Sequence, residues 1–141
     1  MTKEEKEEKE IVKKLLEEHP ISEMVKFSEI DLYEKIEKNP YWIVKYREHY
    51  YNEVAKLEEL EDIKEKILGK RYDYYRFEID KNLSKPEIEK YYLPKDEKVL
   101  QIKKIIRRQK VRVRFFEMAY KVFEKMQWSM KNYIDVLKGN F

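Results

Sequence analysis

The stretch that decides the fold is residues 95–137, KDEKVLQIKKIIRRQKVRVRFFEMAYKVFEKMQWSMKNYIDVL. Its apolar residues follow one another at alternating steps of three and four, and only Gln109 and Gln127 interrupt the series. This spacing predicts one helix of roughly 40 residues, near 60 Å long, and Gly139 is placed to stop it. We expect its seam residues to form the core and the subunit contacts: Val99, Ile102, Ile106, Val113, Phe116, Tyr120, Phe123, Met130, Ile134 and Leu137.

A local alternative exists within this stretch. Residues 111–115, VRVRF, alternate as a strand would, but the helical spacing on both sides favours helix. Further apolar residues beside the seam, such as Phe115, Val122 and Met126, widen the stripe. A stripe this wide predicts packing against more than one partner helix.

A second long helix is predicted over about residues 40–71. Asn39 followed by Pro40 is typical of a helix start, and apolar residues then recur at steps of mostly three and four. Short helices are predicted over residues 28–39, from a capping pattern of Ser28 and Asp31, and over 84–92, from one of Ser84 and Glu87. Residues 1–10, mostly Lys and Glu, are expected to be a frayed start. The prediction is an all-α fold in a single helical domain, residues 1–141.

The length of the 95–137 helix bears on assembly. It exceeds what a domain of this size usually covers, so we expect a helical homo-oligomer formed through the long helices. Antiparallel pairing with the 40–71 helix inside one chain is an equally good explanation for part of the stripe, and both can hold together.

Composition excludes several classes of function. The 141 residues include no Cys, 2 Gly and 12 Tyr. There is no thiolate chemistry, no Gly-rich phosphate loop and no Ser elbow, and neither His19 nor His49 has partners at metal-ligand spacing. We therefore expect no enzyme activity, no cofactor and no metal. No apolar run is long enough for a membrane span, and the charged start is unlike a signal peptide, so an intracellular protein is expected.

Charge is distributed unevenly along the sequence. Residues 1–69 carry a net charge of −6 and residues 70–141 a net charge of +9. Between Glu97 and Glu117 there are eight cations and no acid. Seven of them form a basic belt that avoids the apolar seam, and we take these as candidate nucleic-acid contacts: Lys103, Lys104, Arg107, Arg108, Lys110, Arg112 and Arg114. The alternative is that the belt pairs with acidic residues of the first half, in the same chain or in neighbouring subunits.

A second basic cluster lies over residues 64–77 and contains aromatic rings. Cations that follow phosphates and rings that stack on bases are what binding to a single strand requires. The candidate contacts here are Lys66, Lys70, Arg71, Tyr74 and Arg76. The alternative is that the Tyr rings are amphipathic edges of the core.

Several short segments resemble one protein family. These are KRYDYY at 70–75, EKYYL at 89–93, DEKVL at 96–100 and WSMKNYI at 128–134, followed by Gly139. In their order and spacing, from about Pro40 to Phe141, they are similar to phage recombination mediators of the UvsY type.

The resemblance implies a helical protein that assembles as a homo-oligomeric ring, a heptamer, and binds single-stranded DNA without sequence preference. It implies loading of a RecA-type recombinase onto strands coated by the phage single-strand-binding protein, with no catalytic step. It also implies a phage-encoded protein in the cytoplasm of the infected bacterial host. The basic element of the family falls on residues 69–71, where Arg71 matches, Gly69 replaces a cation and Lys70 is adjacent. The alternative function is a helical oligomeric scaffold that binds only other proteins.

Overall fold

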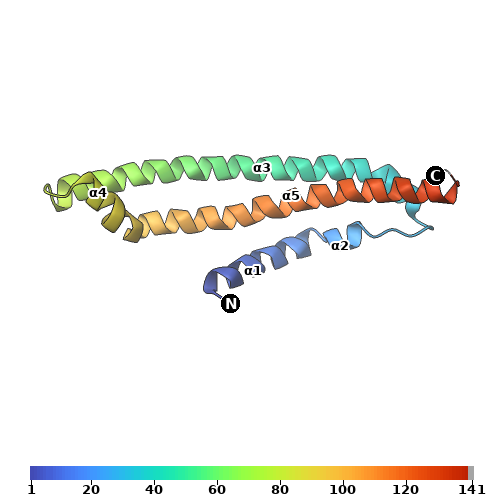
Figure 1. The fold of residues 1–141 in the computed structure, drawn as a ribbon, viewed down its shortest axis with the longest axis horizontal. Helices are drawn as coiled ribbons and strands as arrows, with labels where there is room; N and C mark the ends of the chain where they lie inside the picture. Colours follow the sequence, from blue (N-terminus) through green and yellow to red (C-terminus); the bar gives the residue numbers. More distant parts are fainter. Residues whose placement is uncertain (140–141) are drawn as a thin grey trace. The chain divides into compact units, whose positions relative to one another are not determined.

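The computed structural model describes residues 1–139, which form helices joined by short turns and include no strand (Figure 1). The all-α prediction is confirmed. The last two residues of the predicted 141-residue domain lie outside the described part. In chain order the elements are α1 (Lys3–Glu18), α2 (Ile21–Met24), α3 (Leu32–Asp73), the π-helical η1 (Tyr74–Ile79), α4 (Lys85–Glu87), the π-helical η2 (Ile88–Tyr92), the 3₁₀ turn η3 (Leu93–Lys95) and α5 (Glu97–Leu137).

Helix α3 differs from the sequence expectation because it begins at Leu32 and passes through Pro40 without ending. The turn before it is fixed by Asp31, whose Oδ1 accepts a hydrogen bond of 2.6 Å from the backbone N–H of Ser28. Pro40 lacks the N–H that would bond one turn back. Asn39 does not cap a helix; its buried Nδ2 donates to the Phe123 carbonyl at 2.9 Å and to Gln127 Oε1 at 2.8 Å. These contacts to α5 favour a continuous helix here over a break.

Contacts group the chain into two compact units. Unit 1 consists of residues 1–54 with the chain from 111 onward, and it contains α1, α2, the first part of α3 and the last part of α5. Within unit 1 the two long segments run antiparallel, since Asn39 meets Phe123 whereas Glu53 meets Arg112. Their shared core includes these fully or almost fully buried side chains: Leu15, Leu32, Tyr46, Phe116, Ala119, Phe123 and Met130.

Unit 2 consists of residues 55–110 and has a smaller core of its own. Leu83, Ile88, Leu93 and Val99 are buried there, and Ile67, Leu68, Tyr72 and Tyr75 pack against them. The capping pattern predicted at Ser84 is present. The Glu87 backbone N–H donates to Ser84 Oγ at 3.3 Å, and that hydroxyl donates to Glu87 Oε1 at 3.0 Å.

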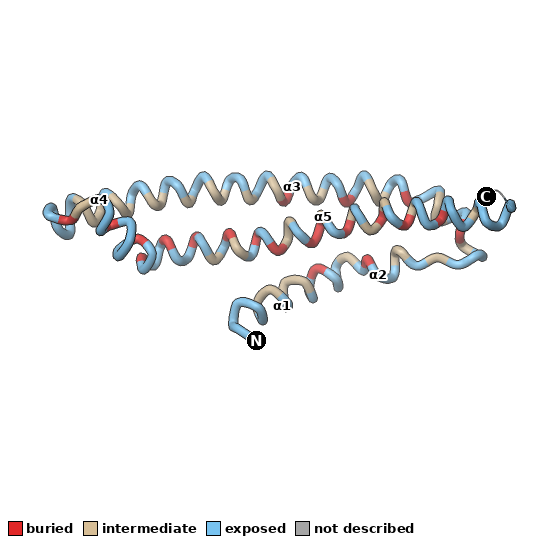
Figure 2. The backbone as a smooth tube through the Cα atoms, viewed as in Figure 1, coloured by how far each residue is buried: buried red, intermediate tan, exposed pale blue. Residues whose placement is uncertain are grey.

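The predicted seam of α5 is largely the buried side of the helix (Figure 2). Val99, Ile102, Ile106, Phe116, Phe123 and Met130 are buried; Val113, Tyr120 and Ile134 are half-buried; Leu137 is 47% exposed. Residues 111–115 are helical, so helix is confirmed over the strand alternative. Gly139 has φ 71° and its N–H donates to the Val136 carbonyl at 3.1 Å, which confirms it as the helix stop.

Candidate nucleic-acid interface

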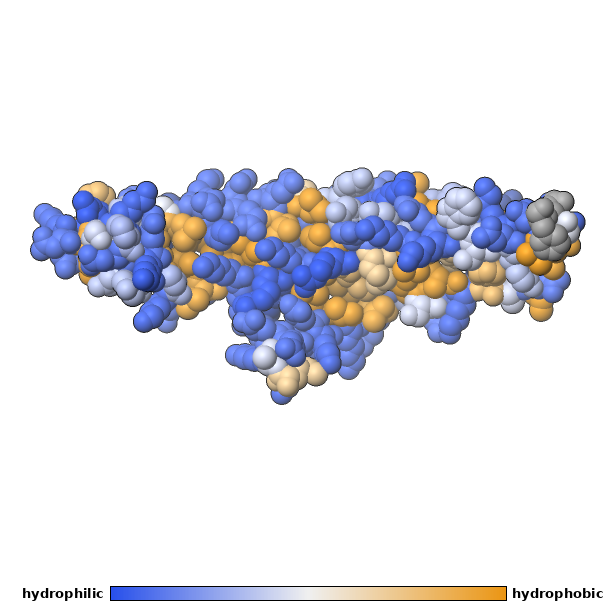
Figure 3. Space-filling model, in the orientation of Figure 1, coloured by the Kyte–Doolittle hydropathy of each residue, from blue (hydrophilic) through white to orange (hydrophobic). Residues whose placement is uncertain are grey.

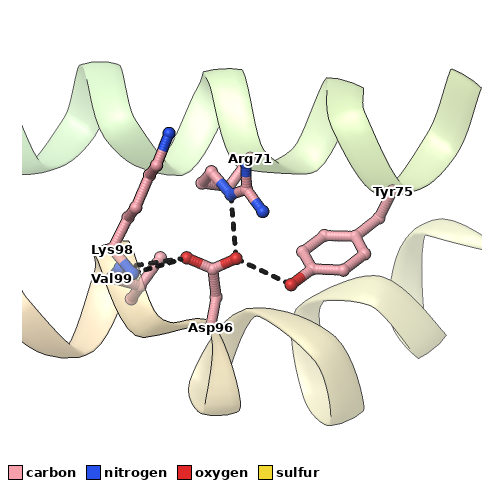
Figure 4. A network of polar contacts seen from close by, with 5 residues as sticks. All are labelled: Arg71, Tyr75, Asp96, Lys98 and Val99. Atoms are coloured by element: carbon pink, nitrogen blue, oxygen red, sulfur yellow. Dashed lines mark hydrogen bonds and ion pairs between the residues drawn. The ribbon is translucent and has the colours of Figure 1, made fainter. Parts of the chain in front are cut away.

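The most highly organised polar group in unit 2 is built around Asp96, the residue before α5 (Figure 4). Its Oδ1 accepts hydrogen bonds from the backbone N–H groups of Lys98 and Val99 at 2.9 and 3.1 Å, so it caps the helix. Its Oδ2 accepts from Arg71 Nε at 2.8 Å and from the Tyr75 hydroxyl at 2.7 Å. One carboxylate therefore fixes the start of α5 against the end of α3.

The pKa shifts in this group follow from these contacts. Burial opposes ionisation of Asp96, yet the hydrogen bonds from Tyr75, Arg71 and Val99 together outweigh it and lower the pKa of the carboxyl. The hydrogen bond to Asp96 raises the pKa of Arg71, and the same carboxylate raises the pKa of Tyr75. The arrangement is an ion pair with a neutral phenol attached.

Three of the predicted nucleic-acid contacts have roles inside unit 2. The Arg71 guanidinium carbon lies 4.2 Å from the centre of the Tyr74 ring, in cation–π contact. Only 20% of the Arg71 side chain is exposed. Arg76 donates to the Leu83 carbonyl. These three residues make contacts inside unit 2. That they also contact DNA stays a prediction.

Lys66 and Lys70 on α3 are different, because both are exposed and neither has an ion pair within the described residues. They are one helical turn apart and therefore lie on the same side of α3. The adjacent Gly69 is also exposed, and a Cβ added there would meet no atom within 4 Å. This part of α3 offers two cations that are available to a phosphate.

The cations of the basic belt lie on different faces of α5, five of them in unit 2 and two in unit 1. Lys103, Arg107 and Lys110 are spaced by four and three in unit 2, so they share one side of the helix, and Lys104 and Arg108 lie on the adjacent side. Lys103 and Lys110 are exposed, whereas Lys104, Arg107 and Arg108 have partners within the chain. Figure 3 shows hydrophilic side chains over most of the face in view, with apolar ones between them.

Arg112 and Arg114, both in unit 1, form pairs of the kind that the alternative reading predicted. Arg112 donates from Nε and Nη2 to the two carboxylate oxygens of Glu53, at 3.1 and 2.9 Å. Glu53 is only 4% exposed, and its hydrogen bonds raise the pKa of Arg112. Arg114 lies 3.8 Å from Glu8 on α1. These two arginines therefore have carboxylate partners in the chain, whereas Lys103 and Lys110 have no ion pair within the described residues.

Sequence reasoning missed both carboxylates that organise these contacts. Sequence reasoning assigned Asp96 no contact role: it stood as an acid after Pro94, a pattern typical of a helix start, and as the first residue of the resemblance segment 96–100. Glu53 carried a weaker signal: a single acid on the apolar stripe of the α3 sequence, between Tyr50 and Leu57.

The described residues 1–139 contain no group of three or more His, Cys, Asp or Glu side chains that could hold a metal ion. None of their helices is long and apolar enough to cross a membrane.

Comparison with known proteins gives one decisive result. Residues 22–139 match the family described as "Recombination, repair and ssDNA binding protein UvsY". The chain belongs to the UvsY family. The match begins upstream of Pro40, so it includes most of α2 and the start of α3 as well as the segments that carry the resemblance. No curated protein and no solved structure matches the chain.

Membership of the UvsY family establishes the broad function. The chain is a mediator protein of recombination and repair that binds single-stranded DNA, a kind of protein without a catalytic step of its own. The exposed lysines of unit 2 are the candidate strand contacts, and the Asp96 group joins α3 and α5, the two helices that carry them.

Proposed function

We propose that this UvsY-family chain loads a RecA-type recombinase onto single strands coated by the phage single-strand-binding protein. It does so by holding the strand on its own cationic surface and weakening the grip of the coating protein. The strand is bound through phosphates, because lysines provide charge without base recognition. Binding therefore depends little on sequence.

The observation that carries the proposal is the charge of unit 2. Residues 55–110 contain 16 Lys and Arg against 12 Asp and Glu, a net charge of +4, while the chain as a whole has +3. Among these cations, Lys66, Lys70, Lys103 and Lys110 are exposed and have no ion pair within the described residues. Tyr74, half-buried on η1 and four residues after Lys70, adds ring surface. Exposed cations with neighbouring aromatic rings are what a sequence-independent single-strand site contains.

The same proposal includes assembly and location. A homo-oligomeric ring, a heptamer, would place several copies of unit 2 along one strand and so raise the overall affinity without new contacts. Exposed apolar side chains on α5, including Leu100, Ile105 and Leu137, support self-association. The chain would be phage-encoded and act in the cytoplasm of the infected bacterial host.

A competition experiment tests the loading function. A labelled oligonucleotide is first saturated with a phage single-strand-binding protein, and a RecA-type recombinase is then added with and without this chain. We expect faster recombinase assembly in the presence of the chain. Equal rates, under conditions where the chain itself binds the oligonucleotide, would contradict loading while leaving strand binding intact.

A second function, a helical scaffold that binds only proteins, is favoured by one observation. Arg112 and Arg114 are paired with Glu53 and Glu8 in the same chain. If all belt cations were paired with carboxylates, the protein would not bind an oligonucleotide, and any of these pairs that join neighbouring subunits would make the assembly dissociate at high salt. Native mass measurement with and without an oligonucleotide separates the two functions.

A further inference from the structure

Unit 2 contains a groove that shares only Lys103 with the proposed strand contacts. It has a volume of about 660 Å³ and lies over Gly69. Its floor is apolar and aromatic, formed by Leu68, Tyr72, Leu93 and Val99. Because Gly69 has no side chain and a Cβ there would meet nothing within 4 Å, this stretch of α3 leaves the groove open.

The charges at the rim determine which class of partner fits. Three carboxylates line the groove, those of Glu65, Asp73 and Glu89, against the two ammonium groups of Lys85 and Lys103. Lys85 is 3.9 Å from Glu89, so these two charges partly balance each other, which leaves Glu65 and Asp73 against Lys103. A rim with more acid than base repels phosphates and attracts cations. The groove is therefore suited to a large apolar side chain with lysines beside it, and not to a DNA strand.

The chain itself carries such a side chain. Trp128 on α5 is 70% exposed, although an indole of this size is among the most favourable groups to bury. Lys125 and Lys131 lie three residues on either side of it, so both share its side of the helix. Both lysines are exposed and have no ion pair within the described residues.

We propose that Trp128 of one copy inserts into the Gly69 groove of a second copy, with Lys125 and Lys131 facing the carboxylates at its rim. The inference rests on the proposed homo-oligomer and names the surfaces that join its subunits. The two surfaces are different parts of the chain, so the contact is head-to-tail. Repeated contacts of this type close into a ring when the rotation permits. The indole is the anchor, because buried Trp side chains dominate the energy of such interfaces.

Fluorescence of Trp128 tests the contact directly. The sequence has two Trp residues, so a Trp42→Phe background leaves Trp128 as the sole reporter. As protein concentration rises through assembly, followed by sedimentation, emission should move to shorter wavelength and acrylamide quenching should fall. If the protein assembles and Trp128 stays fully quenchable, the proposed contact is wrong even though the oligomer exists.

Variants in the same background locate the receiving surface. Gly69→Leu should fill the groove, raise the dissociation constant for self-association at least about tenfold and abolish the emission change. Gly69→Ala is the matched control, since a methyl group leaves most of the groove open and favours helix. Trp128→Ala, at an exposed position, should weaken assembly as Gly69→Leu does. If Gly69→Leu assembles as the parent does, the groove is not the partner surface.

Oligonucleotide binding, measured on the same samples, separates this inference from the proposed function. Monomeric Trp128→Ala protein, altered outside unit 2, should leave Lys66, Lys70, Lys103 and Lys110 unchanged and so bind a short oligonucleotide that only one subunit can cover. Parent protein that binds no oligonucleotide at all would contradict the proposed function. Parent protein that binds but remains monomeric at every concentration would overturn the groove contact and the proposed ring, and would leave strand binding intact.

Discussion

Arg71 Nε donates a hydrogen bond of 2.8 Å to Asp96 Oδ2, and this pair joins the end of α3 to the start of α5. The same carboxylate caps α5, because its other oxygen accepts from two backbone N–H groups. Arg71 is also one of the cations that the sequence predicts as strand contacts. Its side chain therefore stabilises unit 2, independently of any contact that it makes with a DNA strand.

The first prediction concerns the carboxylate itself. Asp96→Asn should keep much of the cap, since Asn is also a good capping residue, but it removes the charge that pairs with Arg71. Because Asp96 is 4% exposed, we expect a loss of about 2 kcal/mol in the free energy of unfolding, measured by urea denaturation. Asp62→Asn, at an exposed carboxylate of α3 that does not line the groove, is the control and should leave the midpoint almost unchanged. Equal midpoints for both variants would contradict the role of Asp96.

The second prediction separates two adjacent cations. Arg71→Ala should lower the stability of unit 2, since it leaves Asp96 without its charged partner. Lys70→Ala should leave stability unchanged and weaken oligonucleotide binding, because Lys70 is exposed and has no ion pair within the described chain. Thermal melts and polarisation titrations of both variants provide the comparison. Unchanged affinity for Lys70→Ala would remove it from the proposed strand site.

The third prediction compares two cations of the basic belt. Arg112→Ala leaves the buried Glu53 carboxylate without its bidentate partner, so we expect a loss of about 3 kcal/mol in unfolding free energy. Lys110→Ala should cost almost no stability and should instead reduce the salt dependence of oligonucleotide binding by about 0.7 in the slope of log K against log salt. A large loss of stability for Lys110→Ala would show that its role is structural.

The fourth prediction is a pH dependence of stability from two histidines in unit 1. His19 Nδ1 is 3.1 Å from the Tyr46 hydroxyl, and the His49 ring stacks on Phe116 with centroids 5.0 Å apart. Burial lowers the pKa of both, and for His49 the neighbouring His19 lowers the pKa further. Unfolding then takes up protons below the ordinary pKa of about 6.5, so stability falls as the pH drops through that value.

Melting temperatures at pH 7.5 and pH 5.5 measure this effect. We expect the midpoint to be a few degrees lower at pH 5.5 and the difference to shrink in a His19→Gln, His49→Gln variant. The pKa of Asp96 is lowered, so the contribution of its carboxylate to folding stability is lost only below about pH 4. Asp96 therefore does not affect the comparison between pH 7.5 and pH 5.5. A parent protein that melts at the same temperature at both pH values would contradict the pKa shifts.

Much of the fold could be predicted because its strongest signals are local. The three-and-four spacing through Val99, Phe116 and Met130 follows from the helical period, and the structure buries all three. The stop at Gly139 and the cap at Ser84 are equally local. The passage of α3 through Pro40 was not predictable in this way. It depends on Asn39 bonding to groups 84 and 88 residues away, which no window of sequence contains.

The candidate site was harder to predict for a related reason. Composition identifies a basic belt but does not show which cations are already paired. Arg112 and Lys110 are indistinguishable in sequence, yet Arg112 meets Glu53, 59 residues earlier, and Lys110 is exposed. Likewise, Arg71 and Lys70 are neighbours in the sequence, but Arg71 is paired with Asp96 whereas Lys70 is exposed. Pairing across long separations decides which charges remain available, and that information exists only in the folded chain.

The central claim, that exposed lysines of unit 2 hold single-stranded DNA by its phosphates, is tested most directly by salt-dependent binding. Polarisation of a labelled oligonucleotide would be titrated at about 50 and 200 mM salt, with two unrelated base sequences. If Lys66, Lys70, Lys103 and Lys110 each neutralise one phosphate, the slope is about −2.8 and affinity falls roughly fiftyfold over this range, equally for both sequences. Absent binding, or affinity unchanged by salt, would contradict the account.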